Sequence, residues 1–204
     1  MVSSSEPIPI VIGVTGAMGS GKSTVSGFFE EWGSQLIDAD LVAHELIEKP
    51  EVLSGIERRF GSEFISGTGK IRRSALADVV FNSRKSLDVY YGIIKEPLII
   101  LLGQKIEEAK HCQKVVVFDA ALLFEWELVE WVDSVVSVYA EREICIKRVM
   151  DRNLLSRSKI EDRISLQLDP KIKQSRADYI IENEGSIEEL GKRAKVVWEI
   201  LQAN

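Results

Sequence analysis

Residues 16–23 read GAMGSGKS and follow, after Thr15, the apolar run IVIGV at residues 10–14. The spacing Gly16-x-x-x-x-Gly21-Lys22-Ser23 fits the Walker A pattern of a phosphate-binding loop. Glycines allow the chain to wrap closely around a phosphate, and successive backbone N–H groups then point inward at the anion. The helix expected from Lys22 adds the positive end of its dipole. The stretch therefore predicts a strand, a phosphate loop and a helix.

This loop also predicts ligands for a nucleotide and for its metal ion. We expect Lys22 to reach the outer phosphates and the hydroxyl of Ser23 to bind Mg²⁺. A chance match in a turn rich in glycine and serine is the alternative, and the strand before the motif and the helix after it disfavour that alternative. The expected phosphate ligands of ATP are Gly19, Ser20, Gly21, Lys22, Ser23 and Thr24.

A second candidate for the metal is Asp119. Four apolar residues, 115–118, precede this carboxylate and resemble a Walker B strand. Many buried strands end in aspartate without binding a metal, so the strand alone leaves both interpretations open.

The rest of the chain alternates strands and helices. Helices between strands require parallel pairing with right-handed crossovers, which predicts a three-layer α/β fold of the P-loop kinase type with a mostly parallel five-stranded sheet. Residues 51–111 carry amphipathic helical patterns and no strong strand signal, with a turn at 66–69 and a new helix expected at Pro97. We expect strands at 8–14, 35–37, 114–118, 133–139 and 178–181, a charged helix at 142–155, and capping boxes at 158–161 and 186–189 that open the last helices.

This order predicts three parts. Residues 1–50, 112–140 and 158–204 would form a nucleotide-binding core, 51–111 a helical substrate-binding insertion, and 141–157 a helical lid.

Composition limits the classes of protein and of partner. The 204 residues are 45% hydrophobic and 28% charged, and the net charge of −6 disfavours a nucleic-acid surface. Residues 1–10 lack the basic start and long apolar stretch of a signal peptide, and no apolar run is long enough for a bilayer. The two cysteines form no CxxC pair and indicate reduced thiols. We therefore expect a cytoplasmic protein without membrane or nucleic-acid partners, a monomer or weak homo-oligomer.

A P-loop can serve a switch, a motor or a phosphoryl transferase. No Asn-Lys-x-Asp motif for reading guanine is present. A kinase needs a group that orients the acceptor hydroxyl, and Asp40 is the candidate because it follows the carboxyl end of the second strand, where open α/β sheets bind ligands. The alternative is that Asp38 and Asp40 only cap the next helix.

Arginines on the charged helix are candidates for closing over the phosphates. Arg148 and Arg152 are four residues apart and share one helix face. Guanidinium groups stabilise charge on a phosphoryl group during transfer. Acidic residues interleave this helix, so a solvated, salt-bridged face is the alternative.

Several segments together resemble the dephospho-coenzyme A kinase family over nearly the whole chain, from about residue 10 to 201. The IDAD, LLFE and AD-Y-I-I-x-N-x-G segments are more specific than the P-loop, which a large superfamily shares. The matching segments are residues 12–24, 37–40 (IDAD), 60–61, 69–76, 80–81, 122–125 (LLFE), 163–167 (RISLQ) and 177–185 (ADYIIENEG).

This resemblance implies ATP-dependent phosphorylation of the ribose 3′-hydroxyl of dephospho-CoA, the last step of coenzyme A synthesis, with Mg²⁺. It implies that Asp40 is the catalytic base, and that Lys22 and Arg148 take part in catalysis, with Arg148 in the lid. Asn183 and Gly185 would lie near the adenine of ATP, and Arg72, Arg73 and Leu123 would contact the acceptor. The chain departs from the family pattern at Glu96-Pro97, usually His-Pro, and at Ala120-Ala121, usually Val-Pro.

Two other functions stay open on the sequence alone. One is a P-loop kinase for another small acceptor, such as a nucleoside monophosphate or shikimate. The other is a nucleotide-dependent binding module that phosphorylates nothing. Trp126 and Trp131, near the third strand, belong either to the core or to the acceptor cleft, with the core favoured.

Overall fold

A single parallel sheet organises the protein in the computed structural model, which describes residues 9–153 and 155–203. Within these residues all neighbouring strands pair in parallel, in the order β2-β3-β1-β4-β5. The predicted five-stranded α/β fold is therefore confirmed. The strands are β1 (Ile10–Gly16), β2 (Gln35–Asp38), β3 (Val115–Asp119), β4 (Ser134–Tyr139) and β5 (Tyr179–Glu182).

Strand β1 lies at the centre because it is apolar on both faces. It pairs with β3 on one side and β4 on the other, so its residues are buried from 11 to 16. β3 is buried over all five of its residues. Strands buried on both faces read as continuous β-branched runs, which is the pattern that the sequence carries here.

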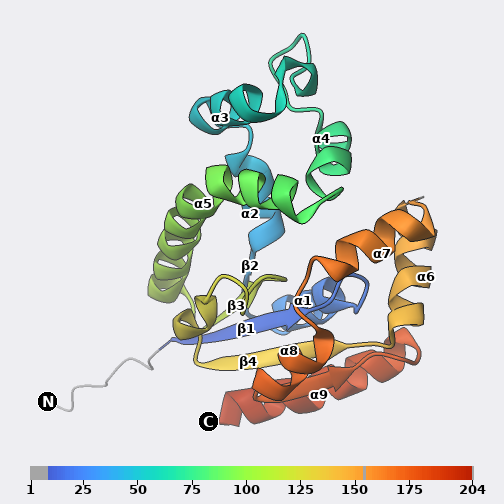
Figure 1. The fold of residues 1–204 in the computed structure, drawn as a ribbon. Helices are drawn as coiled ribbons and strands as arrows, with labels where there is room; N and C mark the ends of the chain where they lie inside the picture. Colours follow the sequence, from blue (N-terminus) through green and yellow to red (C-terminus); the bar gives the residue numbers. More distant parts are fainter. Residues whose placement is uncertain (1–8, 154, 204) are drawn as a thin grey trace, which may run out of the picture.

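Helices cover both faces of the sheet (Figure 1). On one face lie α1 (Lys22–Glu31) and α9 (Ile187–Ala203), and the rings of Phe29 and Trp198 pack at a centroid distance of 5.2 Å. On the other face lie the C-terminal part of α5 (Arg84–Cys112) and α8 (Pro170–Arg176). The predicted three layers are present.

The remaining helices stand beyond the carboxyl edge of the sheet. The helices within residues 39–96 rise above the sheet, and α6 and α7 stand across from them (Figure 1). They are α2 (Ala39–Leu46), α3 (Pro50–Phe60), α4 (Arg73–Val80), α6 (Arg142–Asn153) and α7 (Arg157–Ser165), with the short 3₁₀ turn η1 (Ser62–Phe64). A second 3₁₀ turn, η2 (Leu128–Trp131), precedes β4 at the amino edge of the sheet.

Two local predictions are wrong. Pro97 starts no helix, because it lies inside α5, which is 29 residues long and continues to Cys112. A proline inside a helix costs about 3 kcal/mol, and the buried stripe of Ile94, Leu98, Leu102 and Ile106 offsets that cost. The helix changes direction along its length (Figure 1).

The second error concerns the start of α7. Its N-cap is Ser156, whose hydroxyl accepts a hydrogen bond from the Lys159 amide, so Ser158 lies inside the helix. The predicted box at Ser186 and Glu189 does form, with reciprocal bonds of 3.0 and 3.3 Å. Residue 8 of the first predicted strand, residue 154 of the predicted lid, and residues 1–7 and 204 of the predicted core lie outside the described residues.

Candidate active site

The phosphate loop needs glycine at two positions. Gly19 and Gly21 have φ angles of 82° and 95°, in the left-handed region that side chains rarely adopt. A Cβ on Gly19 would lie 2.5 Å from the Cys145 carbonyl oxygen, and one on Gly21 would overlap the Asn183 amide. The loop is thus packed tightly against α6 and the end of β5, while its N–H groups at the start of α1 have no partner within that helix.

Lys22 lies buried beside two strand ends. Its ammonium group pairs with Asp119, which is 1% exposed at the end of β3. Burial lowers the pKa of Lys22, and the negative charges of Asp40 and Asp38 partly oppose that shift. The lysine therefore stands between the loop and the carboxylates at the carboxyl edge of the sheet.

The residues at this edge fit a magnesium ion. Among the described residues Asp119 Oδ2 has no hydrogen-bond partner although it is buried. Ser23 exposes its hydroxyl at the start of α1. The described residues contain no cluster of three or more acidic, histidine or cysteine ligands, but Mg²⁺ usually takes one or two protein oxygens and completes its shell with water and substrate phosphates.

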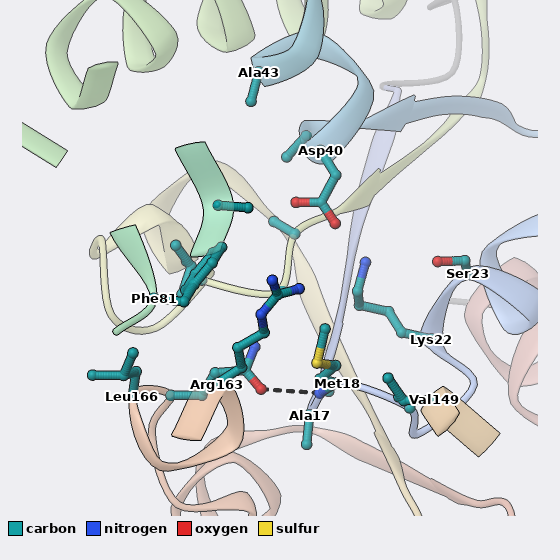
Figure 2. A pocket seen from close by; sticks show the side chains of 18 of the residues that line it. Ala17, Met18, Lys22, Ser23, Asp40, Ala43, Phe81, Val149, Arg163 and Leu166 are labelled. Carbon is teal, nitrogen blue, oxygen red and sulfur yellow. Dashed lines mark hydrogen bonds between the residues drawn. The ribbon is translucent and has the colours of Figure 1, made fainter. Parts of the chain in front are cut away.

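Asp38, the last residue of β2, and Asp40, two residues later, have different roles. Asp38 is the N-cap of α2, and its Oδ1 accepts from the amides of Asp40 and Leu41 at 2.8 and 3.1 Å. Asp40 makes no such cap, and its carboxylate points into a cavity toward Lys22 (Figure 2). The capping alternative therefore holds for Asp38 and not for Asp40.

The phosphate loop, residues 16–24, lines one end of a cavity, which we call the nucleotide end. Asn183 holds Arg148 at this end. Its guanidinium donates to the backbone and side-chain oxygens of Asn183 at 3.0 and 3.2 Å. The amide of Asn183 in turn donates to the Ser20 carbonyl at 2.8 Å. This chain of bonds connects α6, β5 and the phosphate loop. Arg152 and Gly185 line the same end.

One cavity of about 700 Å³ extends from this nucleotide end to helices α2, α4 and α5. Its far half is enclosed by α2, α4 and α5 and is mostly apolar. Trp126 belongs to both the core and the cavity wall, and its ring packs edge-on against Tyr91. Trp131 stacks on Phe118 in the core. The far half is lined by Ala43, Ile47, Leu76, Ala77, Val80, Phe81, Leu87, Tyr90, Tyr91, Ile94, Leu98, Leu102, Trp126 and Leu128.

The residues predicted to contact the acceptor lie in three different environments. Arg73 lines the cavity, but its guanidinium donates to Glu48 at 3.0 Å and to the His44 carbonyl at 3.2 Å. Arg72 is exposed and lies outside the cavity lining. Leu123 is fully buried in the core, where it packs against the position of Gly13, and does not line the cavity either.

A buried ion pair supports the turn that follows β3. Lys173 on α8 is fully buried, and its ammonium lies 2.9 Å from Glu125 and also donates to the Ala121 carbonyl. Glu125 accepts a further bond from the Leu168 amide at 2.9 Å. Next to it Gln167 accepts from the Met18 amide at 2.9 Å, shown dashed in Figure 2. The segment 163–173 thus fixes both the phosphate loop and the wall of the cavity.

Sequence reasoning did not single out Arg163, Gln167, Tyr90 or Tyr91 as site residues. All four line the cavity. A signal existed only for the first two, because they open and close the RISLQ segment. The tyrosines stand in a helix whose pattern resembles that of any buried helix.

The fold and this site define the class of protein as a P-loop kinase. A shikimate kinase from Bacteroides thetaiotaomicron superimposes with a TM-score of 0.55 over 95% of this chain and 98% of that one, at 16% identity, which is a likeness of fold. The protein TT1252 from Thermus thermophilus superimposes with a TM-score of 0.77 at 32% identity, covering 95% of this chain and 98% of that one.

The family follows from the sequence comparisons. Residues 10–189 match the family model described as dephospho-CoA kinase. The dephospho-CoA kinase of Fusobacterium nucleatum is 34% identical over 186 residues, which cover 91% of this chain and 95% of that protein. The chain belongs to the dephospho-CoA kinase family. Along the described residues, no helix combines the length and the apolar character that crossing a bilayer requires.

Proposed function

We propose that Lys22 binds the phosphate that ATP donates and that Asp40 binds the hydroxyl group that accepts it. As a member of its family the chain is an ATP-dependent kinase that phosphorylates dephospho-CoA in coenzyme A biosynthesis. The observation that carries the assignment of roles is the position of Asp40, which faces Lys22 where the phosphate loop meets the apolar half of the cavity (Figure 2). The acceptor group is the ribose 3′-hydroxyl.

The nucleotide end binds the donor. Residues 19–24 surround the β- and γ-phosphates of ATP, and Lys22 contacts the γ-phosphate. Ser23 and Asp119 would hold Mg²⁺, which neutralises phosphate charge when it is bound. Because Asp119 pairs with Lys22 in this structure, bound ATP would draw the ammonium toward phosphate and release the carboxylate. Arg148 and Arg152 face the phosphates, and Asn183 and Gly185 lie toward the nucleotide base.

Asp40 acts at the acceptor. Its carboxylate accepts a hydrogen bond from the hydroxyl, orients that oxygen for in-line attack, and takes the proton as transfer proceeds. Its backbone is fixed because Asp38 binds the Asp40 amide. The apolar half of the cavity holds the nonpolar parts of dephospho-CoA, and Arg73 offers a cation at its edge.

The three parts divide the work. The core, residues 1–50, 112–140 and 158–204, binds ATP, the insertion 51–111 encloses the acceptor, and the lid 141–157 closes over the phosphates and excludes water. We further propose that the chain works in the cytoplasm, as a monomer or weak homo-oligomer.

A transfer assay with ATP and Mg²⁺ tests the acceptor. Dephospho-CoA should yield a 3′-phosphorylated product, whereas AMP, adenosine and shikimate in parallel reactions should yield none. A product from another acceptor alone would leave the fold and the loop intact and replace the substrate. No product from any of them would favour a nucleotide-dependent binding module.

Asp40→Asn tests the role of the carboxylate. Removal of a positioned base typically costs 10²–10⁴-fold in rate, so turnover should fall by roughly that factor while ATP affinity stays nearly unchanged. Asp38→Asn is the matched control, because asparagine caps a helix about as well as aspartate. Nearly full turnover in Asp40→Asn would show that this carboxylate has no part in proton transfer.

A further inference from the structure

Arg163 occupies the same cavity and has no role in the site described above. It projects from α7, and its guanidinium points toward the space between Asp40 and Lys22 (Figure 2). The side chain is 16% exposed. Its Cζ lies 4.9 Å from the centroid of the Phe81 ring, and one nitrogen lies 3.7 Å from Asp78. The charge is thus held inside the molecule by contacts with α4.

Among the described residues the N–H groups of the Arg163 guanidinium find no acceptor, unlike those of Arg148 and Arg157. Arg148 donates two bonds to Asn183, and Arg157 on the same helix donates to Glu143 and Glu161. Within residues 9–153 and 155–203 the Arg163 guanidinium donates no hydrogen bond, although a guanidinium carries five N–H groups. Asp78 is already bonded to Lys159 at 2.8 Å, so it neutralises Arg163 only in part.

A partly buried cation with open donors in this position matches an anion with several oxygens. The planar guanidinium fork binds phosphate through two parallel bonds. Phosphate oxygens enter this cavity with the donor at the Lys22 end, and the acceptor hydroxyl lies at Asp40. We propose that Arg163 is a further catalytic residue, which binds the phosphoryl group while it passes from ATP to the acceptor.

The step itself needs no additional reactant. The bond between the acceptor oxygen and Pγ forms as the bond between Pγ and the β,γ-bridging oxygen breaks, and ADP keeps that electron pair. The hydroxyl proton goes to Asp40. Arg163 exchanges no proton and contributes positive charge near the equatorial oxygens, where negative charge accumulates.

The position of Arg163 also links the reaction to the insertion. Phe81 and Asp78 belong to α4 and its C-terminal end, whereas Arg163 belongs to α7. Lys159, one turn earlier on α7, bonds the same aspartate. The arginine therefore reaches its place only when α4 and α7 stand together across the cavity.

The test compares Arg163→Met and Arg163→Lys with Arg59→Met, a control at an exposed arginine of α3 that does not line the cavity. This proposal rests on the proposed function. We expect kcat to fall about a hundredfold in Arg163→Met, within the range seen for loss of one transition-state donor, with the KM values for ATP and dephospho-CoA changed less than about threefold. Arg163→Lys should recover part of the rate, because it keeps the charge and loses the fork. Arg59→Met should match the unmodified enzyme.

A second measurement separates catalysis from folding. ADP with aluminium fluoride and dephospho-CoA mimics the phosphoryl group in transfer, and its affinity for Arg163→Met should fall by the same factor as kcat/KM. An increase in KM for dephospho-CoA at unchanged kcat would overturn the proposal and place the arginine on the acceptor's own phosphates. So would equal affinity of both proteins for the mimic. An unmodified enzyme that does not phosphorylate dephospho-CoA would instead contradict the proposed function.

Discussion

The two ends of the cavity are built in opposite ways. At the nucleotide end, one continuous loop supplies the proposed phosphate ligands, and backbone geometry dictates its residues, as the left-handed Gly19 and Gly21 show. At the acceptor end, helices α2, α4 and α5 contribute single apolar side chains to a broad wall. With the proposed roles, the difference means that backbone shape would recognise the phosphate, whereas tertiary packing would enclose the large acceptor.

The largest expected effect comes from disturbing the backbone at the nucleotide end. In Gly21→Ala the new methyl group would overlap the Asn183 amide at a φ of 95°, so the loop must distort. We expect kcat/KM for ATP to fall about a thousandfold, or roughly 4 kcal/mol of transition-state stabilisation. Steady-state kinetics and nucleotide titration measure it.

Gly27→Ala is the matched control for this change. Gly27 lies within α1, and a Cβ at this position would meet no neighbouring atom within 4 Å. The variant should retain activity and gain up to about 1 kcal/mol in unfolding free energy, because alanine favours a helix. Equal activity of the two variants would contradict the view that backbone shape governs donor binding.

Filling the acceptor end should produce a smaller and more selective loss. Ala43 on α2 points into the cavity (Figure 2), and Ala43→Trp would take up space there. We expect the KM for dephospho-CoA to rise about thirtyfold, roughly 2 kcal/mol, with ATP affinity unchanged. Ala75→Trp, at an exposed position of α4, should leave both constants unchanged. Loss of ATP binding in Ala43→Trp would show that the two ends are not separate.

The smallest effect concerns the pH dependence of stability at the acceptor end. Burial raises the pKa of Tyr90 from 10.0 to about 12. Below pH 10 the tyrosine is protonated in both states. Between pH 10 and 12 the unfolded chain loses the proton first, so the unfolding free energy decreases, by about 1.4 kcal/mol at pH 11.

Denaturant unfolding at pH 9 and pH 11 measures this decrease. Tyr90→Phe lacks the titrating group, so its stability should decrease by about 1.4 kcal/mol less than that of the unmodified chain over the same interval. The same decrease in both proteins would place the Tyr90 hydroxyl in contact with water.

Features encoded within a short segment were predictable from the sequence. The five strands, the phosphate loop and the box at Ser186 depend on adjacent residues, and all of them form. Pro97 was not predictable, because the helix survives through packing against distant residues. The choice of Ser156 over Ser158 as N-cap was missed because both serines precede a helical pattern.

The site residues also fall into two groups, those that local sequence positions and those that distant contacts position. Lys22 and Asp40 follow strand ends, so topology alone brings them together, and both line the cavity. The position of the Arg163 side chain, by contrast, depends on contacts with Phe81 and Asp78, which precede it by more than 80 residues in the chain. Arg72 and Leu123 show the converse, since a matching segment does not determine which of its side chains faces the cavity.

Helix α5 has a thermodynamic consequence. Its N-terminal half walls the cavity through Leu87 and Leu98, and its C-terminal half packs Ile106 and Ala109 into the same apolar cluster as the sheet residues Val116 and Phe118. With no break in that cluster, heat should melt insertion and sheet in one calorimetric transition. A ligand that binds only in the apolar half of the cavity therefore raises the melting temperature of the sheet as well, although it contacts no strand.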